Sequence, residues 1–541
     1  MNRVENAIEY RRLRSPQDHG GRLVDPPLST VSQLLSASRA VDRKKELELS
    51  DRSIATLSAT ARLHVLRAAI EYTSRYRDVD VSPLDSKASI VMTGHQPELY
   101  HPGVWYKNFV LDHLARTHHA IAINLLIDND TMRQPAIRVP TGTLDSPTLE
   151  SVAFDQMQEE MPYEERRLVD PKLFGSFAKR VCATLSPYIG QPLVNQLWPE
   201  AIAASQANQS LGSLISQARH QLEAAWGLKT LELPLSHVCD SDTFRWFTAT
   251  ILGGLPQFQR IYNDSLFEYR RVNRVRSRSH PVPPLVQDGE WFEAPFWLWS
   301  SSDPRRRRLF ARTVRDGIEI SDLETDRHHL SIFPNGPNEA AIDQLQRLRD
   351  QGVKLRSRAL LTTMFARIFL CDLFIHGIGG AKYDQLTDAI VQRFFGFAAP
   401  EFLTVTATAK LPIQHREVSD LDIREIELKL RELRFNPQRY LASAREAVSL
   451  VNAKSRLIGM KPDYEQRVDR HLQFAQLNDA MQPLVDNERE RLQRERAYLV
   501  RQRRVAKLLG SREYSLCLFP EKTLRPLLLD ILGNNYKLDG H

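Results

Sequence analysis

The chain has 541 residues, of which 42% are hydrophobic and 26% are charged, and its formal net charge is +7. This composition is typical of a globular protein, and the length predicts about three folding units instead of one core. No apolar run approaches the roughly 20 residues that a membrane helix needs, and the first residues lack the apolar stretch of a secretory signal. Four cysteines lie far apart without a CxxC pair. This pattern argues against a zinc cluster and favours free thiols in a reducing cytoplasm.

Residues 1–85 are polar and mixed in character. The spacing of their apolar residues predicts helices near 29–39 and 53–77, so we interpret this stretch as an N-terminal helical segment. The main sheet domain is expected to follow at 86–410.

The segment from 88 to 130 predicts a strand, a helix and a second strand. The run ASIVM has the length and character of a buried strand, apolar residues recur at helical spacing from Val104 onward, and HAIAINLLIDND is a second apolar run that ends in polar residues. In open parallel sheets, ligands bind outside the carboxyl ends of the strands. We therefore expect the loop TGHQPELYHPG, residues 93–103, and the end of the second strand to face a ligand.

This loop and the second strand end supply candidate site residues. His95 is the candidate acid–base group, because the unperturbed pKa of histidine, about 6.5, lies near neutral pH. Asp128 is predicted to be catalytic with it and, like Asp130, could bind an amine, a ribose hydroxyl or Mg²⁺. The candidate binding residues of the loop are Thr93, Gly94, Gln96 and His101, with Lys107 in the helix as a further partner. The alternative is that all of these are ordinary polar groups at strand ends.

An inserted region of about 150–340 is expected within the sheet domain. Helical spacing recurs between 150 and 225. A short apolar strand then precedes a helix that Ser241 can cap.

Proline, aromatic residues and alternating strand signals predict an antiparallel sheet within 269–325, with a hairpin at Asp316 and Gly317. The run RRRR at 305–308 predicts a solvated strand edge, and the alternative is an anion or nucleic-acid patch. Because aromatic residues do not alternate with the basic ones, we do not expect nucleic acid as a partner.

Residues 357–396 combine an apolar helix with a glycine-rich segment, HGIGGAKYDQL, that leads into a second helix. A glycine-rich loop at a helix N-terminus presents backbone N–H groups and a favourable dipole, which suits a phosphate or a carboxylate. Lys382 is the third candidate catalytic residue, because it would neutralise anionic charge. The segment adds further candidate binding residues: His376, Gly377, Gly379, Gly380 and Tyr383. The alternative is that the glycines only permit a tight turn and close packing.

From about 411 to 510 the chain is charged and periodic in apolar residues. The apolar residues follow roughly heptad spacing: Leu477, Met481, Leu484, Leu492 and Leu499. This spacing predicts a long helical hairpin or coiled coil, with a kink or break at Pro483. Such a hairpin commonly pairs with a second copy, so we expect a homodimer. The tail at 511–541 returns to apolar patterning and is expected to dock on the sheet domain.

The order of these segments resembles the bacillithiol biosynthesis cysteine-adding enzyme family. Members of that family have a TGQQ-type loop, a GGPxEIAY-like segment, a coiled coil and an LFPxGxLQER-like tail. TGHQPEL, HGIGGAKYDQL, the helical region and LFPEKTLRPLLLDIL match these features in part, over nearly the whole chain. The resemblance implies an α/β fold, with a Rossmann-like, nucleotidyltransferase-type parallel sheet domain, an inserted connective domain and a coiled-coil hairpin.

The resemblance also implies a reaction. The family joins cysteine to the amine of a glucosaminyl malate and forms an amide, so the chain is expected to be a cytoplasmic bacterial ligase of low-molecular-weight thiol biosynthesis. Its partners would be cysteine and a small anionic substrate, without a membrane. ATP or another nucleotide with Mg²⁺ is the candidate cofactor, and no resident metal site is predicted.

The chain departs from the family at His95, where the family has glutamine, and at IDND, where the family has an EDHD-like strand end. Two alternatives to the cysteine-adding ligase therefore stay open. One is another nucleotide-using transferase on the same fold, and the other is a non-catalytic coiled-coil scaffold.

Overall fold

The computed structural model describes residues 8–11, 13–39, 48–49, 52–79, 88–207, 209–277, 279–325, 327–334, 337–441, 445–461, 463 and 466–531. It forms two compact units. Unit 1 comprises Met1–Val139, Ser151–Lys410 and Arg512–His541, and unit 2 comprises Pro140–Glu150 and Leu411–Ser511. The predicted N-terminal segment and tail both belong to unit 1, although 532–541 lie outside the described residues.

The main sheet of unit 1 has six strands in the order β1-β16-β15-β4-β5-β8. Their bounds are β1 (Arg22–Asp25), β4 (Ile90–His95), β5 (Ile121–Leu126), β8 (Leu231–Pro234), β15 (Leu373–His376) and β16 (Phe402–Ala407). Neighbouring strands are parallel, except that β1 is antiparallel to β16. The chain places β5 and β8 on one side of β4 and β15 and β16 on the other. Unit 1 is thus a mixed α/β unit with a largely parallel sheet, an arrangement compatible with a Rossmann-like fold.

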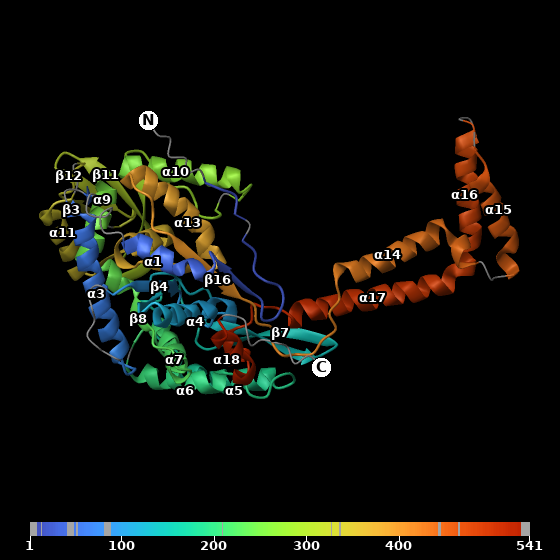
Figure 1. Cartoon of the computed structure of the whole chain (residues 1–541), viewed down its shortest axis with the longest axis horizontal. Helices are drawn as coiled ribbons and strands as arrows, with labels where there is room; N and C mark the ends of the chain where they lie inside the picture. Colours follow the sequence, from blue (N-terminus) through green and yellow to red (C-terminus); the bar gives the residue numbers. More distant parts are fainter. Residues whose placement is uncertain are drawn as a thin grey trace. The chain divides into compact units, whose positions relative to one another are not determined.

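Helices pack around this sheet (Figure 1). Those of unit 1 include α1 (Val31–Arg39), α3 (Ile54–Ser74), α4 (Pro102–Thr117), α5 (Pro171–Leu185), α6 (Val194–Ala204), α7 (Leu211–Ala225), α8 (Leu235–Cys239), α9 (Asp242–Gly253), α10 (Leu255–Val272), α11 (Glu339–Asp350), α12 (Ala359–Phe365), α13 (Ile378–Ile390) and α18 (Glu521–Leu529). α4 packs against β4, β5 and β16, and α13 packs against β15, β16 and α12. The helices predicted within 1–85, after the first strand and between 150 and 225 are confirmed, as is the cap of α9 by Ser241. The predicted docking of the tail is confirmed by the packing of α18 against α4.

A second sheet of unit 1 is antiparallel, in the order β13-β12-β11-β10-β14, with β9 paired to β10. Its strands are β9 (Gln287–Asp288), β10 (Trp291–Ser300), β11 (Asp303–Val314), β12 (Gly317–Ser321), β13 (Arg327–Leu330) and β14 (Val353–Ser357). A short pair, β2 (Glu48–Leu49) and β3 (Arg52–Ser53), lies outside both sheets. The hairpin predicted at Asp316 and Gly317 is confirmed, because Val314 at the end of β11 pairs with Gly317.

The arginines predicted at a solvated strand edge, residues 305–308, belong to β11, where Arg307 and Arg308 pair with β10. On its other side β11 pairs with β12 only from Phe310 to Val314, so the arginines lie at an edge of the sheet. Two of them, Arg305 and Arg308, are exposed, and the other two are half-buried. The arginines form ion pairs with five carboxylate residues: Asp130, Glu293, Asp303, Asp322 and Glu324. The sequence pattern could not show these pairs, because two of the partners lie in other parts of the chain.

Two strand boundaries differ from the predictions. The residues of β15 were predicted as part of an apolar helix that leads into a glycine-rich segment. In the structure, a π-helical turn at Ala366–Leu370 ends α12, and β15 follows as a short central strand. A run of four residues is too short for periodicity to separate strand from helix. β4 extends through His95, which was predicted as loop, because Gly94 and His95 pair with β5. The strands β6 (Ala136–Thr143) and β7 (Ser146–Ala153), which pair with each other, were not predicted.

Unit 2 contains the helices α14 (Asp420–Phe435), α15 (Val448–Gly459), α16 (Gln466–Met481) and α17 (Asp486–Leu509). α14 and α17 pack as a pair, and so do α15 and α16 (Figure 1). The buried core between α14 and α17 consists of Ile423, Ile426, Leu492 and Leu499. The predicted break at Pro483 is confirmed by a 3-10 turn at Gln482–Val485 between α16 and α17. Across the described part of the chain, none of the helices has the length and apolar character required to cross a bilayer.

Candidate active site

A cavity of about 910 Å³ opens at the carboxyl ends of β4 and β15. The strand order of the main sheet reverses between these two strands, since β4 is followed in the chain by neighbours on one side and later by β15 on the other. Ligands of open α/β sheets bind at such a reversal, where the connections leave toward opposite faces. The topology therefore places a hollow where this class of sheet binds its ligands.

The cavity brings together most of the predicted site residues. Those that line it are Gly94, His95, Gln96, His101, His376, Gly377, Gly379, Gly380, Lys382 and Tyr383. Thr93, Asp128 and Asp130 are not among its lining residues. Thr93 is buried at the base of the crevice, where its hydroxyl donates a 2.8 Å hydrogen bond to the carbonyl of Ile375 and joins β4 to β15.

Helix α13 begins at the cavity without a side-chain cap. Gly377 is its N-cap residue, and the first turn contains no acidic residue. Within the described part of the chain, no side chain caps this turn. The first N–H groups of a helix have no partner within the helix and carry the positive end of its dipole. The start of α13 can therefore bind an anion that enters the cavity.

Lys107 brings a buried positive charge to the same crevice. It lies on α4, only 4% of it is exposed, and its Nζ donates a 2.7 Å hydrogen bond to the carbonyl of Gly94. Among the described residues, no carboxylate forms an ion pair with it. Burial, and then the nearby charge of Arg219, lower the pKa of Lys107 to about 7.

His95 lies at the end of β4, where a hydrogen bond and an aromatic contact hold its ring. Its Nδ1 donates a 3.2 Å hydrogen bond to the carbonyl of Gln96, and the ring packs edge-on against Tyr100 with centroids 4.9 Å apart. Burial, and then the charge of Lys107, lower the pKa of His95 to about 3. The imidazole is therefore neutral at physiological pH and can offer a hydrogen bond to a ligand.

His101 caps the N-terminus of α4 and also lines the cavity. Its Nδ1 accepts a 3.1 Å hydrogen bond from the N–H of Gly103, which leaves Nε2 facing the carboxylate of Glu513 at 3.6 Å. Arg512, next to Glu513, donates to the carbonyl of Ala407 at 3.0 Å and also lines the cavity. The C-terminal segment thus completes the site beside the first turn of α4.

Asp128 and Asp130 make contacts that hold the strand end in place. Both carboxylate oxygens of Asp128 accept from Ser236, at 2.9 Å from its N–H and 2.5 Å from its hydroxyl. Burial, and then the charge of Glu164, raise the pKa of Asp128 to about 7. Asp130 accepts from Gln96 at 2.8 Å and forms an ion pair with Arg306 at 2.8 Å. These partners link the end of β5 to the loop after β4, to α8 and to β11.

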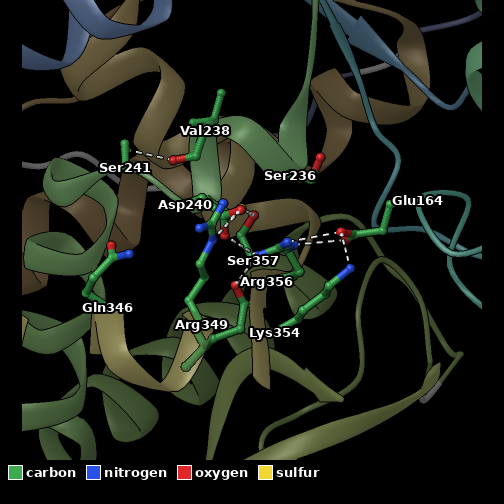
Figure 2. A network of polar contacts seen from close by, with 12 residues as sticks. Glu164, Ser236, Val238, Asp240, Ser241, Gln346, Arg349, Lys354, Arg356 and Ser357 are labelled. Atoms are coloured by element: carbon green, nitrogen blue, oxygen red, sulfur yellow. Dashed lines mark hydrogen bonds and ion pairs between the residues drawn. The ribbon is translucent and has the colours of Figure 1, made fainter. Parts of the chain in front are cut away.

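The segment beside Asp128 is held by a network of charged side chains (Figure 2). Arg356 forms ion pairs with Glu164 at 2.9 Å and with Asp240 at 2.9 Å, and Lys354 approaches Glu164 at 3.4 Å. The backbone N–H of Glu164 donates to the carbonyl of Asp128 at 2.8 Å. The network therefore connects the antiparallel sheet to the end of β5, outside the cavity.

A further cluster of buried charged side chains lies close to Tyr100, the residue that packs against His95. Arg219 forms ion pairs with Glu223 and Glu232, and the guanidinium lies 5.9 Å from the ring centroid of Tyr100. His220 lies within 4.8 Å of the same carboxylates and could complete a set of metal ligands. Since Arg219 already supplies the positive charge between the carboxylates, the cluster fits an ion-pair network that supports Tyr100 and, through it, His95.

Several cavity residues were not predicted as site residues. Arg14 comes from the N-terminal segment, Arg512 from the C-terminal segment, and Asp384 from α13. Arg14 and Arg512 belong to no motif in the sequence. The fold brings them to the cavity from parts of the chain that are distant from the other site residues. Asp384 could have been found, because it stands one and a half turns after the glycines of a predicted ligand-binding helix.

Comparison of the chain with models of protein families and with curated proteins finds no match.

Proposed function

We propose that the cavity between β4 and β15 binds the phosphate or carboxylate groups of small anionic substrates, and that the protein is a ligase of the cysteine-adding type. The observation that carries the proposal is Lys107, a buried cation without a carboxylate partner among the described residues. A buried charge costs free energy unless it is paired. An anionic substrate at the strand ends would supply the missing negative charge.

The other charges of the cavity support a ligand with more than one anionic group. Lys382 and the uncapped start of α13 lie on one side, while Arg14 and Arg512 come from the chain termini. The volume of about 910 Å³ is at the upper end of the range for small-molecule sites, which is roughly 300–1,000 Å³. ATP or another nucleotide therefore fits as the co-substrate that activates a carboxyl group, with cysteine and an amino-sugar conjugate as the groups to be joined.

The acidic residues predicted as Mg²⁺ ligands do not fit that role. Ser236 binds both oxygens of Asp128, Arg306 pairs with Asp130, and neither carboxylate lines the cavity. We therefore assign phosphate binding to Lys107, Lys382 and the start of α13, and no metal site to the two aspartates.

The proposal includes a fold assignment and an assembly. Unit 1 would be a Rossmann-like, nucleotidyltransferase-type domain with the antiparallel sheet as its connective insertion, and unit 2 would be a coiled-coil hairpin of a cytoplasmic homodimer. Leu421, Leu428 and Phe435 support the dimer, because they lie seven residues apart on the exposed side of α14. Leu421 is 74% exposed although its type is normally buried, and a second copy would cover it.

A second candidate is another nucleotide-using transferase on the same fold. The observation that favours it is the presence of His95, His376 and Lys382 around the cavity, where the motifs of the cysteine-adding family have other residues. Both candidates predict nucleotide binding, and they differ in the acceptor.

The test is a reconstituted reaction with purified protein, ATP, cysteine and glucosaminyl malate, followed by mass spectrometry of the thiol products. The ligase proposal predicts an amide of cysteine with the amino sugar, and its loss in Lys107→Met. Nucleotide binding without that product would support the transferase. Absence of both nucleotide binding and product would contradict both candidates and favour a scaffold.

A further inference from the structure

His376, at the end of β15, forms a buried pair with Asp384 of α13. The Nε2 of His376 lies 2.6 Å from Oδ2 of Asp384. The imidazole packs against Phe374 with centroids 4.6 Å apart and meets Phe402 edge-on at 5.1 Å. The ring therefore has one orientation, fixed by a carboxylate and two aromatic contacts.

Asp384 is held as a carboxylate by several donors. Arg367 donates to Oδ2 at 2.9 Å, while the hydroxyls of Thr363 and Thr387 donate to Oδ1 at 2.6 and 3.1 Å. Burial alone would raise the pKa of Asp384, but its interactions with His376 and Arg367 outweigh burial and hold the pKa well below its usual range. Because a carboxylate only accepts hydrogen bonds, the Nε2 of His376 carries the hydrogen of this pair.

The other ring nitrogen, Nδ1, is next to the first turn of α13. A side chain at position 380 would place its Cβ 2.5 Å from Nδ1, so only glycine leaves this space open. His376 and Gly380 both line the cavity, and no described residue shares a hydrogen bond with Nδ1. With the hydrogen on Nε2, Nδ1 of the neutral ring is the acceptor.

We propose that His376 is a catalytic residue whose Nδ1 accepts the proton of the attacking amine, and that Asp384 is its positioning residue. The inference rests on the proposed function for the identity of the reactants, an amine and an acyl phosphate. The acyl phosphate is the mixed anhydride that forms when a carboxylate takes the terminal phosphate of a nucleoside triphosphate and the nucleoside diphosphate leaves. The amine nitrogen forms a bond to the carbonyl carbon, and its proton moves to Nδ1. The bond between that carbon and the phosphate oxygen breaks, and the leaving phosphate keeps the electron pair. The imidazolium, stabilised by Asp384, then returns its proton to solvent.

The charged groups that face His376 come from three other elements. Asp384 of α13 contacts it directly, Arg367 of the π-helical turn acts through Asp384, and Lys107 of α4 lines the same cavity. His95, whose pKa burial lowers to about 3, is left to orient the substrate.

The activity test compares wild type with His376→Gln, Asp384→Asn and Gly380→Ala. Gly175→Ala is the matched control, because it also replaces a helical glycine and its Cβ meets nothing within 4 Å. His376→Gln should lower kcat by about a hundredfold or more with the KM for ATP unchanged. Asp384→Asn should lower kcat with the KM for ATP unchanged. Gly380→Ala should lower kcat as His376→Gln does, and it should also unfold earlier than wild type, because its Cβ displaces a ring that is fixed in place. Full turnover by a folded His376→Gln protein would overturn the proposal.

A second readout needs no turnover. Diethyl pyrocarbonate acylates the lone pair of an imidazole, and peptide mapping by mass spectrometry identifies the modified histidines. We expect His376 to be modified in wild type and in Gly175→Ala, protected by ATP, and unmodified in Gly380→Ala. An unreactive His376 in wild type would overturn the proposal even if the ligase reaction is observed. A reactive His376 in a protein that forms no amide product would uphold the base and reject the proposed substrates.

Discussion

At the residue scale, the charge state of Lys107 links ligand binding to pH. Its pKa is lowered to about 7 by burial and by Arg219, so the amine is largely neutral at pH 8 when the cavity holds no anion. A phosphate beside Nζ favours the charged form. Binding of ATP at pH 8 should therefore take up a proton. Calorimetry in buffers of different ionisation enthalpy measures this uptake, which should disappear in Lys107→Met. Equal uptake by wild type and variant would assign the proton to another group.

Asp128 gives a second prediction at this scale. Its pKa is raised from 3.8 to about 7, mainly by burial, so between these values the folded state binds more protons than the unfolded state. The stability of wild type should then decrease as the pH rises from about 4 to 7. Asp128→Asn removes this ionisation and can still bond to Ser236. We expect the variant to gain about 2 °C or more in melting temperature at pH 8 and little at pH 4. A lower melting temperature at pH 8 would show that the ionised carboxylate is the favourable form.

At the element scale, Gly103 determines how closely α4 approaches β16. A Cβ at this position would lie 2.3 Å from the carbonyl oxygen of Ala407 and 2.5 Å from the guanidinium of Arg512. Backbone cannot yield as a flexible side chain does, so Gly103→Ala should destabilise unit 1 by about 1–3 kcal/mol. Thermal unfolding monitored by circular dichroism checks this expectation. Gly190→Ala, whose Cβ meets no atom within 4 Å, is the control, and equal melting temperatures for the two variants would contradict the packing argument.

The exposed apolar residues of α14 make a prediction about assembly. If Leu421 and Leu428 are covered by a second copy, the double variant Leu421→Glu, Leu428→Glu should be monomeric at micromolar concentration by light scattering, while wild type is dimeric. Arg424→Glu alters charge on the same helix without removing an apolar contact and should remain dimeric. A monomeric wild type would reject the homodimer.

The elements that the sequence predicts well are those with long or repeated patterns. β4, α4 and β5 follow from their apolar spacing, and the helices of unit 2 and the break at Pro483 follow from the periodic apolar residues and the proline. β15 could not be separated from the preceding helix because four apolar residues fit either structure. The arginines of β11 lie at an edge of the sheet as predicted, but their ion pairs with Asp130 and Glu293 could not be predicted, because these partners lie elsewhere in the chain.

At the scale of the whole molecule, the sequence predicts the site only in part. His95 follows an apolar run at a strand end, and the rule for parallel sheets brings such ends to one edge, whereas His376 was predicted only from the glycine-rich segment at a helix start. The same rule placed Asp128 with them, but the structure directs its carboxylate to Ser236, outside the cavity. Arg14 and Arg512 enter the cavity from opposite ends of the chain, which no local pattern can show.

The central claim is that the cavity between β4 and β15 binds a phosphate-bearing ligand through a buried lysine. The most direct measurement is calorimetric titration of ATP into wild type, Lys107→Met and Lys179→Met, the last of which removes an exposed lysine of α5. Loss of a charge-assisted hydrogen bond predicts an affinity lower by about tenfold or more in Lys107→Met. Lys179→Met should bind as wild type does. Binding of ATP with equal affinity to all three proteins, or to none, would contradict the claim.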